Sequence, residues 1–365
     1  WLPPGEPAEL RLVPRGEVAS TRWMQLSLTP NQAHQSDIYR AVELLAGRRP
    51  CAGPYNVYFG DIHTHSGQVM DRADNSGCGC GSRADNYRYA LGPGGLDFYA
   101  LTDHERQIDA TDPAGYYALA DTFHQDGRFA CLPAYEFTSP AYGHRNVYFR
   151  DVPDVMVNNV RCDGNDAIQP VEHISPRELW RQLQAGGVRF FTVPHHPSAS
   201  SHPCTWDIFD PQYDRLVEVY SVWGSSEYYG DVPRGVSDRY RTLDVRDAIR
   251  RGLQFGLIAS ADGHDGHPGN AQSPLWKHHH QFHFCGSGRA AVLAERLTRH
   301  DVWDALCGRR CYATSGPPIE LDVRLDGQWM GSQLPARTDA GPTLTVDVGG
   351  TNALREVRIV KDGAV

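Results

Sequence analysis

Between residues 56 and 260 the chain alternates short apolar segments with segments that carry helix start signals, and this alternation constrains the fold most. The segments with the length and composition of strands are 56–62, 97–102, 128–137, 145–149, 188–193, 215–222 and 254–260. Strands that alternate with helices build βαβ units around a mostly parallel sheet. With this number of strands, the pattern predicts an α/β barrel.

The segments between these strands begin with residues that favour helix initiation. Residues 112–113, Asp-Pro, combine an N-cap with proline at the first helical position. Residues 175–178, Ser-Pro-Arg-Glu, form a capping box, and the glycines at 186–187 end that helix. We expect Asp244 to cap a later helix and Asp301 to cap another.

The length and the later sequence pattern divide the chain into three parts. The chain has 365 residues, enough for one barrel-sized domain and an appendage. We expect residues 1–55 to form an N-terminal extension packed on the barrel, and residues 56–315 to form the barrel domain. Within residues 316–365, apolar residues alternate with period two over 319–325 and 343–348, which predicts a small antiparallel, sandwich-like β segment. The chain stops within what resembles a strand and turn, so we expect a missing tail.

Composition narrows the possible partners and compartments. The net charge of −9 argues against a general nucleic-acid binder, which would carry a basic surface. No apolar run approaches the roughly 18–20 residues that span a bilayer. We therefore expect a soluble protein, either cytoplasmic or periplasmic or secreted with its signal absent from this chain. The nine cysteines cannot all pair within one chain. Cys78-Gly-Cys80-Gly could be a metal or redox pair, although its spacing is not the usual C-x-x-C.

Polar residues gather just beyond the ends of the predicted strands. His63 and His65 follow the first strand, and because side chains alternate along a strand, both imidazoles face the same side. The later strand ends carry Asp103, His104, Glu136, His144, His195, His196, Asp262 and His264, and Asp71 stands six residues after His65. The βα loops of a parallel barrel converge at one mouth, so we expect these side chains to meet there.

The residue types in this set are those of metal sites. Imidazole and carboxylate groups together are ligands for Zn, Mn and Fe. The set holds more groups than one tetrahedral ion needs, which predicts two or three divalent ions that share a bridging carboxylate. Each residue alone has a simpler explanation, because a histidine at a strand end often only meets solvent, and Asp103 or Asp262 could cap a loop. Their repetition at successive strand ends favours the metal site.

The same series resembles the PHP (polymerase and histidinol phosphatase) superfamily of metal-dependent phosphoesterases. The likeness rests on His-x-His at 63–65, Asp71 six residues on, Thr-Asp-His at 102–104, a glutamate, further histidines and Asp-x-His at 262–264. Segments that resemble more closely an uncharacterised PHP-like branch, described as a domain of unknown function, are 58–63, 145–149, 194–196, 218–227, 258–264 and 310–316. The resemblance covers about residues 56–320.

The resemblance implies a distorted (β/α)7 barrel with up to three metal ions. Matched residue by residue, the first ion would be held by His63, His65, Glu136 and Asp262, and the second by Asp71, His104 and His264. Glu136 would bridge to a third ion, held also by His144 and by either His195 or His196. The usual His-Pro pattern favours His196, whereas the local Pro-His-His pattern favours His195. Many relatives have histidine where this chain has Asp71, whose oxygen would make the second site friendlier to Mn or Fe.

Other residues beside the predicted ligands could take part in the chemistry. Arg106 and Arg145 could clamp an anionic phosphate, or could instead form salt bridges to excess ligand charge. His267, in a loop after the last ligands, could act as a general acid. Asp61 and Asp103 could orient metal-bound histidines, or could only hydrogen-bond to loops.

Three functions agree with these residues. The first is a metal-dependent phosphoesterase that cleaves a small anionic phosphate mono- or diester with a metal-bridged hydroxide. The second keeps the metals and cleaves a sulfate, carboxylic or lactone ester, or an amide. The third is a non-catalytic binding protein, which the full ligand series argues against.

Overall fold

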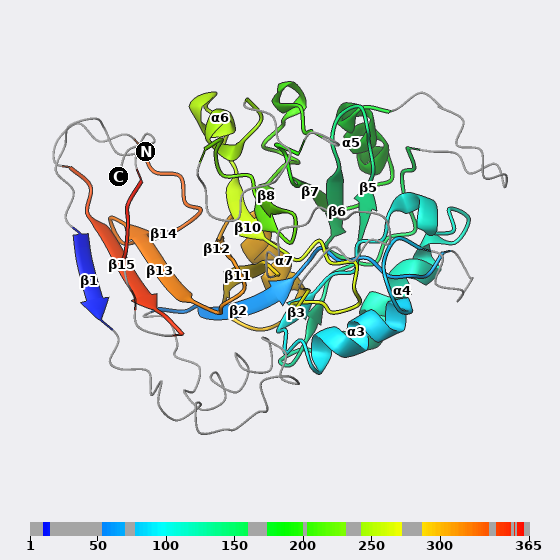
Figure 1. Cartoon of the computed structure of the whole chain (residues 1–365), viewed down its shortest axis with the longest axis horizontal. Helices are drawn as coiled ribbons and strands as arrows, with labels where there is room; N and C mark the ends of the chain where they lie inside the picture. The colour runs from blue at the N-terminus through cyan, green and yellow to red at the C-terminus, as the bar shows by residue number, and fades with distance from the viewer. Residues whose placement is uncertain are drawn as a thin grey trace.

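The computed structural model has a mixed α/β fold with several sheets and few helices (Figure 1). It describes the backbone of residues 10–14 and residues 53–69, 77–159, 174–199, 203–230, 242–271, 287–335, 341–351, 354 and 356–360. Of the predicted metal ligands, Asp71 lies outside the described residues.

The largest sheet has five strands in the order β12-β11-β2-β3-β4. Its members are β2 (Asn56–Asp61), β3 (Phe98–Tyr99), β4 (Ala130–Cys131), β11 (Arg289–Ala294) and β12 (Cys311–Thr314). The strands β2, β3 and β4 run parallel, as the alternation with helices predicts. In contrast, β11 runs antiparallel to both β2 and β12.

Two three-stranded sheets adjoin this one. One consists of β5 (Ala134–Phe137), β6 (Arg145–Phe149) and β7 (Phe190–Pro194), all antiparallel. In the other, β8 (Leu216–Ser221) pairs in parallel with β10 (Gly256–Ala259) and antiparallel with the short β9 (Gly224–Ser225). The antiparallel pairing of β5 and β6 departs from the expected parallel order. The connection 138–144 is too short for a parallel crossover, which needs roughly a dozen residues or more.

Isolated bridges link these sheets near the predicted mouth. Parallel bridges join Thr64 to Gly263, His104 to Glu136, and Thr192 to Asp214. They connect the end of β2 to the end of β10, the end of β3 to β5, and β7 to the start of β8. The described strands therefore surround one region, but they form several sheets and not one continuous closed barrel.

The helices begin close to where the capping signals place them. They are α3 (Arg83–Leu91), α4 (Pro113–Phe123), α5 (Pro176–Ala185), α6 (Val245–Arg250) and α7 (Arg299–Cys307), with short 3₁₀ turns η1 (Glu105–Gln107) and η2 (Trp206–Ile208). The side chains of Asp112, Ser175 and Asp244 accept backbone N–H groups, which confirms the predicted caps. The prediction for Asp301 was wrong, because the Thr298 side chain caps α7 by accepting the Asp301 N–H.

In the part of the chain that the structure describes, no helix combines the length and apolar character that crossing a membrane requires.

Two apolar clusters hold the strands in place. One lies under α7 and includes Phe98, Val292 and Leu306, all without exposed surface. The other joins α3, α4 and α5 to the strands through residues such as Tyr117 and Leu179. Because protein interiors are closely packed, these clusters give the strand ends fixed positions.

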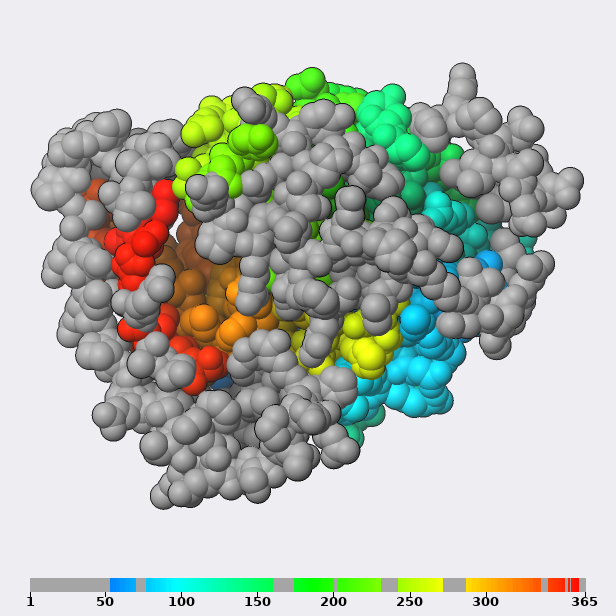
Figure 2. All heavy atoms as spheres, in the orientation of Figure 1, coloured from blue at the N-terminus to red at the C-terminus, as the bar shows by residue number. Residues whose placement is uncertain are grey.

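A fourth sheet lies away from the strand ends that surround the predicted mouth. Its order is β1-β15-β13-β14, with β1 (Leu10–Pro14) parallel to β15 (Leu344–Gly349), and with β13 (Glu320–Leu325) antiparallel to β15 and β14 (Gln328–Trp329). The antiparallel pairing of β13 and β15 confirms the period-two prediction. In Figure 2 the red C-terminal strands and the cyan segment that contains α3 lie on opposite sides of the same face. The domain boundaries remain predictions.

Candidate metal centre

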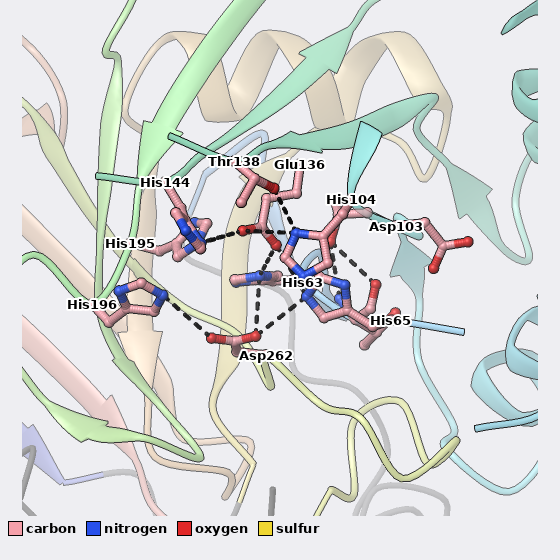
Figure 3. Close-up of polar contacts among 12 residues, drawn as sticks. His63, His65, Asp103, His104, Glu136, Thr138, His144, His195, His196 and Asp262 are labelled. Atoms are coloured by element: carbon pink, nitrogen blue, oxygen red, sulfur yellow. Dashed lines mark hydrogen bonds and ion pairs between the residues drawn. The ribbon is translucent and has the colours of Figure 1, made fainter. Parts of the chain in front are cut away.

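The ends of strands from all three adjoining sheets bring histidines and carboxylates together (Figure 3). His63 and His65 follow β2, His104 follows β3, Glu136 lies in β5, and Asp262 follows β10. Each of these side chains is buried, and His63 has no exposed surface at all. Buried ionisable groups at this density need partners, because removing a charge from water is costly.

Four ligand atoms meet at one point of this cluster. His63 Nε2 lies 3.4 Å from Glu136 Oε2 and 3.2 Å from Asp262 Oδ1. His65 Nε2 lies 3.1 Å and 3.4 Å from the same two oxygens. With bonds of about 2.0–2.1 Å, the ligand atoms of a tetrahedral zinc ion lie about 3.3–3.4 Å apart. The donor set and its spacing therefore fit one small divalent ion.

The second oxygen of Glu136 faces a different group of histidines. Oε1 lies 2.6 Å from His144 Nδ1, 3.4 Å from His104 Nδ1 and 3.4 Å from His195 Nε2. Each oxygen of this single carboxylate thus contacts its own set of imidazoles. That is the arrangement a bridging carboxylate needs.

A further group consists of His144, His195 and His196, whose ligand atoms lie within 4.8 Å of one another. The His195 ring is fully buried, and among the described residues its Nδ1 has no hydrogen-bond partner, while its Nε2 makes only the long contact with Glu136 Oε1. Burying such a polar atom without a partner is unfavourable, and a metal ion would satisfy it. His196 Nε2 lies 3.9 Å from Asp262 Oδ2. The sequence left open whether His195 or His196 is the ligand, and both lie in the cluster.

The last group combines His65, Cys78, His104 and His264, again within 4.8 Å. His104 and His264 were predicted to share a site with Asp71, which lies outside the described residues. Cys78 was noted in the sequence but not included among the predicted ligands, because its spacing from Cys80 matches no usual motif. Its position between two glycines, shortly after His-x-His, is the sequence feature that could have indicated Cys78 as a candidate ligand.

Side chains around the cluster fix the orientation of its histidines. Glu218 Oε2 lies 2.9 Å from His63 Nδ1, and Thr138 Oγ1 lies 2.6 Å from His104 Nδ1. Carboxylates and hydroxyls placed in this way set the tautomer and ring angle of a metal-binding histidine. Sequence reasoning missed both roles, since neither residue stands directly beside a predicted ligand.

Asp61 and Asp103 instead hold loops, which was the simpler of their two interpretations. Asp61 accepts backbone N–H groups of His63, Ala261 and Gly269. Asp103 accepts hydrogen bonds from the backbone and hydroxyl of Ser66, at 2.7 and 2.8 Å, and from Arg83 Nε. Burial raises the pKa of Asp61 to about 6, despite its three backbone hydrogen bonds. These carboxylates join the strand ends that carry the ligands.

The charges within the cluster shift the pKa values of its members strongly. Burial alone would lower the pKa of His63, but Asp262 and Glu218 raise it to about 10. Burial would raise the pKa of Glu136, yet His104, His195 and His144 hold it well below its usual range. Burial and the neighbouring His63 lower the pKa of His195 to about 3, which favours its neutral, ligand-competent form.

The cluster also contains unusual backbone geometry. Asp262 has φ 49° and His196 has φ 32°, in the left-handed region that residues other than glycine rarely adopt. Such conformations cost about 1–3 kcal/mol each and concentrate at functional sites. The local fold therefore accepts strain to direct these two side chains.

The three predicted catalytic residues have different surroundings. Arg145 is fully buried, with its Nε 3.3 Å from Asp214 Oδ1 and its guanidinium donating to the Tyr142 carbonyl. Its charge is thus matched by Asp214, which favours the salt-bridge alternative over the substrate clamp. Arg106 is exposed in η1, two residues after His104. His267 is 41% exposed, and its Nδ1 lies 3.3 Å from Asp265 Oδ2.

Sequence comparison places the chain among proteins described only in general terms. A family described as proteins of unknown function (DUF3604) matches residues 97–220 and 273–338, slightly more than half of the chain. An uncharacterized protein from Chlamydia pneumoniae is 24% identical over 327 residues, covering 85% of this chain and 48% of the relative. An uncharacterized protein from Chlamydia muridarum is 23% identical over 325 residues, with 84% and 48% covered. The chain therefore spans about half the length of these relatives.

Solved structures show only distant likeness. A two-domain protein from Bacteroides vulgatus, described as containing a predicted PHP-like metal-dependent phosphoesterase, is 16% identical with a TM-score of 0.42, covering 73% of this chain and 67% of that chain. PsfC from Pseudomonas syringae is 15% identical with a TM-score of 0.40, covering 72% and 94%. Endonuclease Q, solved with a duplex substrate containing an abasic lesion, is 11% identical with a TM-score of 0.38, covering 69% and 57%.

Proposed function

The chain belongs to the DUF3604 family of proteins of unknown function, and from this starting point we propose that it is a metal-dependent hydrolase of phosphate esters. The observation that carries the proposal is Glu136, whose two oxygens contact separate groups of buried histidines. Two adjacent ion positions that share one carboxylate are typical of hydrolytic sites with two metals.

The finer assignment is membership of the PHP superfamily with its distorted (β/α)7 barrel. It is supported by the order of ligands along the chain, from His-x-His at 63–65 to Asp-x-His at 262–264. It is also supported by the bridges that connect the strand ends around the cluster. The ligand set proposed for Zn, Mn or Fe is His63, His65, Asp71, His104, Glu136, His144, His195, His196, Asp262 and His264.

The chain's own residues would have three tasks in such a reaction. When bound, divalent ions would supply a nucleophile from water near neutral pH and neutralise the charge that develops on the ester oxygens. Glu218 and Thr138 keep His63 and His104 in the ligating orientation. Asp61 and Asp103 fix the loops from which those ligands project.

Two further residues are proposed to contact the substrate. Arg106 is exposed beside His104, where its guanidinium could bind an anionic phosphate in two-point fashion. His267 is partly exposed, and its hydrogen bond to Asp265 raises its pKa, so it holds a proton that a leaving alkoxide could accept. Both residues project from loops that follow ligand-bearing strand ends.

The test is hydrolysis by protein reconstituted with Zn, Mn or Fe. We expect turnover of aryl phosphate mono- or diesters that a chelator abolishes and added metal restores. Matched aryl sulfate, carboxylic ester, lactone and amide substrates separate the phosphoesterase from the other hydrolases that the same ligands would serve. Metal-loaded, folded protein that cleaves none of these bonds would contradict the hydrolase and favour the binding protein.

A further inference from the structure

We propose that Cys78 is a sulfur ligand of the second metal position, together with His104 and His264, and that this position prefers zinc. The inference rests on the proposed function, because it assumes that the cluster holds metal ions. It assigns a role to the Cys78-Gly-Cys80-Gly segment, which the predicted ligand set left unexplained.

The geometry around Cys78 is that of a mixed sulfur–nitrogen site. Its sulfur and one ligand atom each of His65, His104 and His264 lie within 4.8 Å of one another. The His65 ring is stacked between the other two, with centroids 4.6 Å from His104 and 4.3 Å from His264. Since His65 Nε2 faces Glu136 and Asp262, the first and second positions adjoin at this ring.

The backbone around Cys78 is built to bring its sulfur to the cluster. Gly77 N donates to the Gly67 carbonyl at 2.7 Å, and Gly79 N donates to the Ser66 carbonyl at 3.0 Å. Any Cβ at position 79 would overlap the His65 carbonyl, and one at position 77 would overlap the Gln107 side chain. Only glycine on both sides lets the segment lie directly on the residues that follow His65.

The remaining contact of Cys78 is also polar. Its sulfur lies 2.9 Å from Gln107 Oε1, and Gln107 belongs to η1, which begins one residue after His104. The thiol is therefore held on the same turn as one of its proposed co-ligands. A structural cysteine normally packs among apolar side chains, whereas Cys78 faces three imidazoles and an amide.

Sulfur ligation changes the expected metal. On binding, the thiol would lose its proton to solvent and coordinate as thiolate. Thiolate is a soft ligand that favours zinc, whereas an aspartate oxygen such as that of Asp71 would favour Mn or Fe. The two candidate ligands for this position therefore predict opposite metal preferences.

The experiment is X-ray absorption of the zinc-loaded full chain, with cobalt-substituted protein as a second readout. We expect a zinc–sulfur shell at about 2.3 Å beside nitrogen and oxygen at about 2.0–2.1 Å. The cobalt form should show a sulfur-to-metal charge-transfer band. Cys78→Ser should remove the band and weaken zinc binding at this position by at least about tenfold. Cys80→Ser and Asp71→Asn should retain the band.

The outcomes separate this inference from the proposed function. Protein that binds metal without a sulfur shell overturns the role of Cys78 and leaves the metal-dependent hydrolase standing. A band that survives in Cys78→Ser, or that is lost in Cys80→Ser, also overturns it. Protein that binds no metal at all overturns both. The wild-type absorption measurement is decisive even if Cys78→Ser fails to fold.

Discussion

His144 and Arg145 are consecutive buried residues where β6 begins, and they differ in the partners that their side chains contact. His144 faces Glu136 in the metal cluster, whereas the next residue, Arg145, pairs with Asp214. Consecutive residues of extended chain point to opposite sides, which separates the two groups. Both lie in the protein interior, so burial alone does not distinguish them.

The difference lies in the partners. Within the part of the chain that the structure describes, the Arg145 guanidinium contacts one carboxylate, that of Asp214, which also accepts a hydrogen bond from the Thr192 hydroxyl at 2.7 Å. Around Glu136, in contrast, imidazoles from several strand ends converge on the two oxygens of a single carboxylate. A buried ion pair such as Arg145–Asp214, in which the two charges neutralise each other, stabilises the fold. A buried cluster with more imidazole nitrogens than carboxylates to pair with them is arranged to bind a ligand such as a metal ion.

The largest expected effect is on the metal cluster. Asp262→Asn removes one of the charged oxygens facing His63 and His65, so metal binding at the first position should fail. We expect kcat/KM for the best phosphate ester to fall at least about a thousandfold, or about 4 kcal/mol of transition-state stabilisation. Zinc content and circular dichroism measured on the same sample check that the fold persists. Unchanged activity would remove Asp262 from the site.

The Arg145–Asp214 pair should respond in the opposite way. Arg145→Met leaves the Asp214 carboxylate buried without its cation, which should lower the free energy of unfolding by about 3–5 kcal/mol. Urea unfolding measures this loss, and metal content per folded chain should not change. If stability is unaffected while KM for phosphate esters rises, Arg145 is the substrate clamp that its position in the sequence suggested.

A smaller effect is expected from Glu218, which supports the cluster without belonging to any of its ligand groups. Glu218→Gln weakens the partner of His63 Nδ1, and metal affinity should fall about 10–100-fold. Competition with a chelator of known affinity measures the change. Glu227→Gln, an exposed residue that follows the same strand pair, is the matched control and should bind metal normally. Equal affinities in both variants would contradict the orienting role.

The smallest effect concerns the partly exposed His267 and the largely buried carboxylate of Asp265 beside it. Asp265 raises the pKa of His267, and a general acid loses activity as pH rises through its pKa. Asp265→Asn should therefore move the basic limb of the kcat profile to lower pH, and His267→Gln should remove that limb. A basic limb that stays in place in both variants would exclude His267 as the acid.

Much of this arrangement follows from local sequence rules. Strand-end histidines at 63–65 share a face because of the period of a strand, and the caps Asp112, Ser175 and Asp244 are recognisable from short motifs. The approach of Glu136 to His63 was expected because strand ends converge at one mouth, whereas their assignment to the same ion came from the family resemblance.

The parts that could not be predicted depend on contacts between distant segments. Glu218 supports His63 because β8 lies beside the strand that precedes Asp262, and no motif encodes that pairing. The sequence left a substrate clamp and a salt bridge as alternatives for Arg145, because its partner Asp214 lies in a distant segment. Cys78 reaches the cluster through close glycine packing, which spacing rules for metal-binding cysteines do not describe.

The central claim is that Glu136 joins adjacent metal positions, and the number of ions per chain tests it most directly. Elemental analysis of the purified and reconstituted full chain should find two or three Zn, Mn or Fe ions per folded molecule. Glu136→Gln, folded by circular dichroism, should hold fewer ions than the wild type. No bound metal in the wild type after reconstitution, or a single ion that Glu136→Gln retains, would contradict the account.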